Sequence, residues 1–204
     1  MNHPHPQLIQ SRLDKLHPTQ LTVGRREVAQ KRKRWGALGK KARAAALDSH
    51  WFPAVLGPGG RYYITDHHHF GLALLEEEVK QVSLLMLSDL SWLDMPTFWR
   101  VMNFHQWVHP YDDQGKLRDV DAVPARLTGL HDDPYRSLAG EVREAGGFSK
   151  DVTPFSEFLW ADYFRQHLRR ALLERDFAGA LRQARKLAGA REARYLPGWC
   201  GPAV

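Results

Sequence analysis

The spacing of apolar residues changes twice between residues 53 and 90. Two short β-prone runs, "PAVLG" and "RYYITD", lie on either side of Pro58-Gly59-Gly60, which is a sequence typical of a tight turn. From Phe70 to Glu78 the apolar positions recur at helical spacing, and residues 81–90 form an almost continuous apolar run. The pattern predicts a β-hairpin, a short amphipathic helix and a buried strand, in that order.

The segment before the hairpin predicts a strand and two helices. Residues 16–24 are typical of a short strand surrounded by turn residues. Residues 25–35 predict a basic helix whose inward side chains are Val28 and Trp35. The helix that follows must end before Pro53, because the residue preceding a proline avoids the helical region.

The second half of the chain is typical of helices and loops. Asp133 directly before Pro134 predicts a helix start, and Gly146-Gly147 predicts its end. Residues 153–190 are amphipathic with an interruption near Asp176–Gly179. We therefore predict an α+β protein with a core over residues 1–92, a helical extension packed on that core over 93–196, and a tail over 197–204.

The charge of the chain favours a polyanionic partner. Its 204 residues carry a formal net charge of +6, with nine basic residues and one acidic residue between Arg25 and Arg43. A second basic stretch, from Arg165 to Arg194, has nine basic and three acidic residues. Both stretches could be solvated helix faces or could line a groove for phosphate groups.

Cysteine content and hydropathy narrow the class of protein. Cys200 is the only cysteine, which excludes an internal disulfide and a cysteine-based zinc site. No apolar run approaches the roughly 18 residues of a membrane span. The first residues also lack the apolar segment of a secretory signal. We therefore expect a cytoplasmic protein with no membrane partner.

The run Asp66-His67-His68-His69 follows the second hairpin strand and opens the next helix. Asp66 is a natural N-cap residue, which would place His67–His69 in the first helical turn. The partial positive charge of a helix N-terminus lowers the pKa of histidine and attracts phosphate oxygens. This turn is therefore a candidate phosphate or catalytic site.

Two other interpretations of the histidine run stay open. Consecutive helical residues point about 100° apart, so three histidines in a row are poorly placed to bind one metal ion, and we predict no metal site. One or two of the histidines could instead cap the helix in a partly buried turn, with no contact to a ligand.

These features resemble the ParB-like family of small bacterial proteins, within the ParB/sulfiredoxin superfamily. The resemblance rests on "LHPTQLTVGRREV", "YYITDHHHFGLAL", "WVHPYD", "DDPYRSLAG" and "PFSEFLWADYFR", from about residue 15 to 170. It implies a small mixed sheet with helices, followed by a mostly helical C-terminal region. The superfamily signature, Asp-Gly-His-His-Arg, opens a helix whose N-terminus holds nucleotide phosphates.

The match to that signature is incomplete. Asp66, His68 and His69 occupy the aspartate and histidine positions, whereas His67 and Phe70 stand at the glycine and arginine positions. The glycine would let backbone approach a phosphate, and the arginine would supply charge to it. Sulfiredoxin chemistry is excluded, because it needs a cysteine in this turn.

The resemblance implies a nucleotide-binding protein, such as an ATP- or ADP-dependent phosphotransferase or nucleotide hydrolase acting on a small metabolite. The implied catalytic residues are Asp66, His68, His69 and Glu27, the last by similarity to ADP-dependent serine kinases. The nucleotide, which could be ATP, ADP or CTP with Mg²⁺, would contact His67–His69. Further expected contacts are Arg25, Arg136 and Ser137, the last two at another helix start.

Two alternative functions stay open at this point. The chain could bind DNA or act as a ParB-like nuclease, since its basic stretches could contact nucleic-acid phosphates. It could also be a non-catalytic interaction protein that keeps the fold, because the signature glycine and arginine are replaced. The sequence does not predict the acceptor substrate or the oligomeric state.

Overall fold

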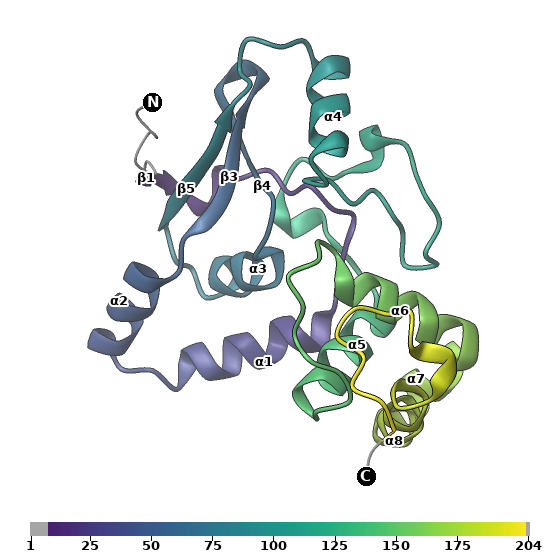
Figure 1. The fold of residues 1–204 in the computed structure, drawn as a ribbon. Helices are drawn as coiled ribbons and strands as arrows, with labels where there is room; N and C mark the ends of the chain where they lie inside the picture. The colour runs from purple at the N-terminus through teal and green to yellow at the C-terminus, as the bar shows by residue number, and fades with distance from the viewer. Residues whose placement is uncertain (1–7, 203–204) are drawn as a thin grey trace. The chain divides into compact units, whose positions relative to one another are not determined.

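The computed structural model describes residues 8–202, which form two compact units (Figure 1). Unit 1 contains residues 8–21, 28–111 and 117–130, and unit 2 contains residues 22–27, 112–116 and 131–202. Each unit has its own cluster of buried apolar side chains. Within residues 8–202, none of the helices combines the length and apolar character that crossing a bilayer requires.

Unit 1 is built on a four-stranded mixed sheet with the strand order β1-β5-β3-β4. The strands are β1 (Leu8–Arg12), β3 (Phe52–Gly57), β4 (Arg61–Ile64) and β5 (Gln81–Asp89). β3 runs parallel to β5, whereas the β1–β5 and β3–β4 pairs are antiparallel. The predicted hairpin is confirmed, and Gly59 and Gly60 in its turn have φ values of 72° and 71°, a region that favours glycine.

The strand predicted as buried over residues 81–90 is β5, and it is only partly buried. Val82 and Leu84 are buried on one face, while Leu87 is 40% exposed. Side chains of a strand alternate between the two faces of the sheet. The prediction of a buried strand is therefore only partly right, because the residues of β5 after Leu84 are half-buried or exposed.

Helices cover both faces of the unit 1 sheet. The helices of this region are α1 (Arg25–Gly36), whose first three residues belong to unit 2, α2 (Lys40–Ser49), α3 (His68–Glu76) and α4 (Met95–Phe104). Ile64 of β4 lies beside Gly71 of α3, while its neighbour Tyr63 packs on Phe98 of α4 with ring centroids 4.7 Å apart. Because neighbouring strand residues point to opposite faces, α3 and α4 cover opposite faces of the sheet.

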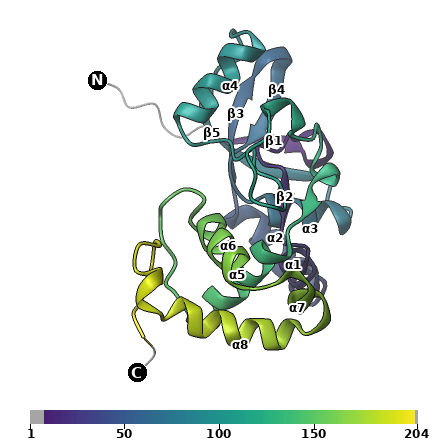
Figure 2. The same cartoon turned by 90° about the vertical axis from the view of Figure 1, so that its right-hand side faces the viewer.

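Unit 2 is mostly helical. Its elements are β2 (Thr22–Val23), β6 (His131–Asp132), α5 (Pro134–Glu144), α6 (Ser156–His167), α7 (Arg170–Arg175) and α8 (Phe177–Ala188). α5 packs against α6 and α8 (Figure 2). Trp160 and Phe148 stack in the core with ring centroids 4.2 Å apart.

The short strand predicted within residues 16–24 lies at the end of that segment. Only Thr22–Val23 form a strand, β2, which pairs in parallel with β6. His17 and Gln20 form isolated bridges. Pro18 between them has no backbone N–H to donate, so a continuous ladder cannot form along this segment.

The described residues confirm an α+β protein with a small mixed sheet and a helical C-terminal region. Short 3-10 helices complete it at Leu13–Lys15, Pro58–Gly60, Val120–Ala122, Leu127–Gly129 and Arg191–Ala193. The predicted tail, 197–204, includes Trp199, which packs against the unit 2 core, while residues 203 and 204 lie outside the described part. The division predicted between residues 92 and 93 stays a prediction.

Two phenylalanines of α4 provide a matched test of this packing. Phe98 is fully buried against Val55 of β3 and Tyr63 of β4, whereas Phe104 is 80% exposed. We expect Phe98→Ala to lower the free energy of unfolding by about 3–5 kcal/mol, because it removes buried area and leaves a cavity. Phe104→Ala should change it by less than about 0.5 kcal/mol. Urea unfolding measures both values, and similar losses would contradict the assigned burial.

Candidate functional site

The predicted N-cap at Asp66 was wrong by one position, because the residue that precedes α3 is His67. His67 adopts a left-handed conformation, with φ 64° and ψ 21°, and α3 begins at His68. The carboxylate Oδ1 of Asp66 accepts a hydrogen bond from the backbone N–H of His67 at 2.6 Å. The position that carries glycine in the superfamily signature is thus the one with a positive φ, which glycine adopts without strain.

His68 is buried and serves to position this turn. Its Nε2 accepts a hydrogen bond from the backbone N–H of Thr19 at 3.0 Å, and the Thr19 hydroxyl donates to the Ile64 carbonyl at 2.9 Å. Burial lowers the pKa of His68 to about 3, so the ring is neutral with Nε2 unprotonated. The predicted low pKa therefore has burial, and not the helix terminus, as its main cause. Because the ring is buried and its Nε2 already accepts from Thr19, His68 is poorly placed for its predicted role at a phosphate.

The accessible part of the turn consists of Asp66 and His67. Asp66 is exposed, His67 is half-buried, and His69 is 7% exposed. The ring of His50, which directly follows α2, lies 6.4 Å from the ring of His67 between centroids. Sequence reasoning missed His50, because only the fold brings the end of α2 to the start of α3.

Aromatic side chains pack beside His50 and His67. Phe52 and Phe70 stack with nearly parallel rings, 6.1 Å apart between centroids. His67 contacts Phe52 edge-on at 5.9 Å, and His50 lies 5.2 Å from Phe70. Phe70 stands at the signature's arginine position, so an apolar ring takes the place of a phosphate-binding cation.

The other predicted site residues lie together in unit 2, where Arg136 is the centre of an ion-pair network. Arg136 is 6% exposed, and its Nη1 donates to Glu27 Oε2 at 3.0 Å. Its Nη2 donates to Glu157, which also pairs with Arg143. The predicted catalytic Glu27 and the predicted phosphate ligand Arg136 are therefore partners of each other.

The start of α1 is capped by polar groups near the start of α5. The backbone N–H of Arg25 donates to the Asp132 carboxylate at 2.8 Å, and that of Arg26 donates to Ser137 Oγ at 3.3 Å. Gly24 lies so close to Ser137 that an added Cβ would be 2.6 Å from its Oγ. Arg25 and Ser137, which were predicted to contact a nucleotide, thus both have protein partners here, through the Arg25 N–H and the Ser137 hydroxyl.

A carboxylate also occupies the start of α5. Asp133 caps the helix through the Tyr135 N–H at 2.9 Å and pairs with Arg165 at 2.7 Å. Burial raises the pKa of Asp133, although the nearby Arg165 opposes this shift. A negative group already stands where an anion would bind, which favours a structural role for this end of unit 2.

The loop "WVHPYDD" also has defined contacts. His109 stacks on Tyr111 with centroids 4.6 Å apart, and its backbone N–H donates to the Thr19 carbonyl at 2.8 Å. Thr19 thus connects this loop to His68 within unit 1. Among residues 8–202, no group of three or more histidine, cysteine or acidic side chains could hold a metal ion.

The buried state of His68 predicts a pH dependence of stability. With a folded pKa of about 3 and an unfolded value of about 6.5, the unfolded chain binds an extra proton between these limits. The contribution of the neutral His68 ring to the free energy of unfolding is therefore fully present above about pH 6.5. Below that pH it falls by up to about 1.4 kcal/mol per pH unit. His68→Gln removes this titration, so its deficit in unfolding free energy should shrink as the pH falls.

The matched control is His131→Gln, because His131 is exposed on β6. It should retain the pH slope of the wild type. Chemical denaturation at several pH values measures both variants. A constant difference between wild type and His68→Gln would contradict a neutral, buried His68.

The Arg136 network predicts a large effect on stability. Arg136→Met leaves the carboxylates of Glu27 and Glu157 without this partner in a mostly buried position, and we expect a loss of about 3 kcal/mol or more. Arg182→Met is the control, since its side chain is 71% exposed, and it should cost less than about 1 kcal/mol. Equal losses in urea unfolding would argue against the network.

Comparisons with known proteins agree with this fold. The chain resembles the crystal structure of protein Atu1540 from Agrobacterium tumefaciens, with 45% identity and a TM-score of 0.90 over 97% of this chain and 100% of that one. Among curated proteins, none matches the sequence. The family described as "Putative ParB-like nuclease" matches residues 9–166. This match covers more than half of the sequence, and the chain belongs to the ParB-like nuclease family.

Proposed function

We propose that this protein binds nucleic acid and cleaves phosphodiester bonds at the start of α3 in unit 1. The observation that carries the proposal is the pairing of His50 with His67 beside the carboxylate of Asp66. Two imidazoles at this spacing are compatible with one phosphate group within hydrogen-bond reach of both rings. The family description names a nuclease, which supports the same class of reaction.

The hydrogen bonds of His50 suit it to act as a base. Its Nδ1 lies 3.1 Å from the Ala46 carbonyl, which can only accept, so the neutral ring carries its proton on Nδ1. Nε2 then has a lone pair that can take a proton from the attacking water or hydroxyl. His67, in its protonated form, would donate a proton to the leaving oxygen, with the Asp66 carboxylate stabilising that charge.

Basic side chains of α1 and α2 would supply the attraction for the nucleic-acid backbone. Lys33, Lys40 and Lys41 are exposed, and α2 leads directly to His50. Arg32 is less available, because it pairs with Glu76 and Glu77 at the end of α3. Cations of this kind bind phosphates without reading base sequence, so affinity should fall as salt rises.

A nucleotide is the second candidate ligand. The exposed carboxylate of Asp66 stands at a helix start, where phosphate oxygens and a Mg²⁺ ion could bind together. ATP, ADP or CTP would then be the substrate or cofactor, and a small metabolite would accept the phosphoryl group. Glu27 no longer supports this reaction, since it pairs with Arg136 in unit 2.

Cleavage of labelled single-stranded and duplex DNA and RNA, with and without Mg²⁺, tests the first proposal. We expect His50→Ala and His67→Ala each to slow cleavage by about 100-fold or more, because each removes a proton-transfer group. Their affinity for the same strands should change little, since the lysines remain. His131→Ala, which alters an exposed histidine of unit 2, should cleave at the wild-type rate.

Other results would contradict the nuclease proposal or favour a different function. Cleavage that is absent in the wild type, or unaffected in both histidine variants, would overturn the nuclease proposal. A thermal shift with ATP, ADP or CTP that needs Mg²⁺ and is lost in Asp66→Ala would favour the nucleotide candidate. Binding of no nucleotide or nucleic acid would favour an interaction protein that keeps the fold.

A further inference from the structure

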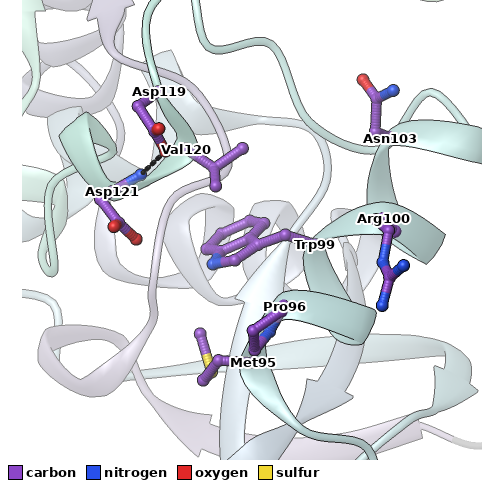
Figure 3. Close-up of a pocket in the computed structure, with 8 residues that line it drawn as sticks. All are labelled: Met95, Pro96, Trp99, Arg100, Asn103, Asp119, Val120 and Asp121. Atoms are coloured by element: carbon purple, nitrogen blue, oxygen red, sulfur yellow. Dashed lines mark hydrogen bonds between the residues drawn. The ribbon is translucent and has the colours of Figure 1, made fainter.

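A pocket of about 480 Å³ lies on the α4 side of unit 1, and the proposed function does not use it (Figure 3). It is lined on one side by α4 and on the other by the segment from Asp119 to Asp121. α4 covers the opposite face of the sheet from α3. Its volume is within the range of about 300–1,000 Å³ that is typical of small-molecule sites.

Trp99 provides a flat surface in the middle of this pocket. Figure 3 shows its indole between α4 and the Asp119–Asp121 segment, with the ring nitrogen directed away from α4. The ring is held by edge-on contacts with Tyr63 at 5.5 Å and Phe98 at 5.1 Å. The indole N–H has no acceptor among the described residues. A rigid, half-buried indole of this kind can stack on a planar ligand at little entropic cost.

Polar groups at the edge of the pocket match the edge of a nucleobase. The amide of Asn103 and the carboxylate of Asp121 have no side-chain partner among the described residues, and both lie in the pocket lining. An amide offers a donor and an acceptor together, and a carboxylate accepts from an exocyclic amino group. Met95, Pro96 and Val120 complete the lining with apolar contacts.

The charge of the pocket restricts the ligand further. Asp119 and Asp121 bring two carboxylates, and Arg100 brings one cation, whose Nη2 already donates to Thr97. A ligand phosphate inside the pocket would meet more negative than positive charge. The base of a ligand therefore fits this pocket better than its phosphates do.

We propose that this pocket binds a nucleobase that carries an amino group, stacked on Trp99 and hydrogen-bonded by Asn103 and Asp121. Adenine and cytosine have such an amino group, whereas uracil does not. The base could come from a free nucleoside or from an unpaired position in a nucleic-acid strand. The site does not depend on the histidines at the start of α3.

Calorimetric titration with adenosine, cytidine and uridine tests this proposal, because nucleosides carry no phosphate. We expect adenosine and cytidine to bind, with uridine about tenfold weaker or more, since it lacks the amino donor for Asp121. Asp121→Ala and Asn103→Ala should each weaken adenosine by about tenfold. Asp48→Ala, an exposed aspartate of α2, is the matched control and should bind adenosine like the wild type.

A second titration uses a short single strand of adenine nucleotides. If adenosine does not bind, but this strand binds and loses affinity in Asp121→Ala, the pocket takes an unpaired base of a strand. Binding of adenosine itself assigns the pocket to a nucleoside. Either result supports the proposal. The binding that is observed should be unchanged in His50→Ala and His67→Ala, even where these variants lose cleavage.

Three results would overturn the proposal. The first is that neither the nucleosides nor the strand binds. The second is that binding is unchanged in both Asp121→Ala and Asn103→Ala. The third is that choline binds and no nucleoside does, which would make the pocket a cation site formed by Trp99 and the carboxylates. Asn103 and Asp121 are exposed, so their variants should fold even if Trp99→Leu does not.

Discussion

The hydrogen bond from Thr19 to the buried ring of His68 fixes the geometry of unit 1 around the start of α3. It joins the segment before α1 to the first turn of α3, and Thr19 also donates to the Ile64 carbonyl at the end of β4. A charged imidazole could not occupy this position without a large desolvation cost. The neutral ring therefore holds three segments together, and it leaves Asp66 and His67 at the accessible edge of the turn.

A different interaction organises unit 2. Arg136 lies between two carboxylates, Glu27 and Glu157, that come from the starts of α1 and α6. Buried ion pairs of this kind contribute little net stability compared with apolar residues, but removal of one partner is costly. The start of α1 also has a protein partner on α5, because Ser137 Oγ accepts a hydrogen bond from the backbone N–H of Arg26.

These two arrangements change the interpretation of the sequence motifs. Several residues that the motifs assigned to a ligand have protein partners for their polar groups. They are His68, Arg136 and Ser137. The candidate chemistry moves to the accessible neighbours Asp66 and His67, with His50 added from α2. A family motif thus combines residues that build the turn with residues that could meet a ligand, and burial separates the two kinds.

The sequence by itself determined the elements whose signals are local. Examples are the hairpin at Pro58–Gly60, the buried side of α1 at Val28 and Trp35, and the start of α5 at Asp133. Turn chemistry, helical spacing and caps act within a few residues, so the sequence carries this information directly. The α+β class and the family followed from the same local segments and their order.

The tertiary structure alone decided which side chains are buried and which meet across long sequence distances. Thr19 and His68 are 49 positions apart, and Arg136 and Glu27 are 109 positions apart. The pocket at Trp99 likewise needs α4 and the segment from Asp119 to Asp121 to come together. Such contacts depend on how whole helices and strands pack, and no spacing pattern within one segment specifies that packing.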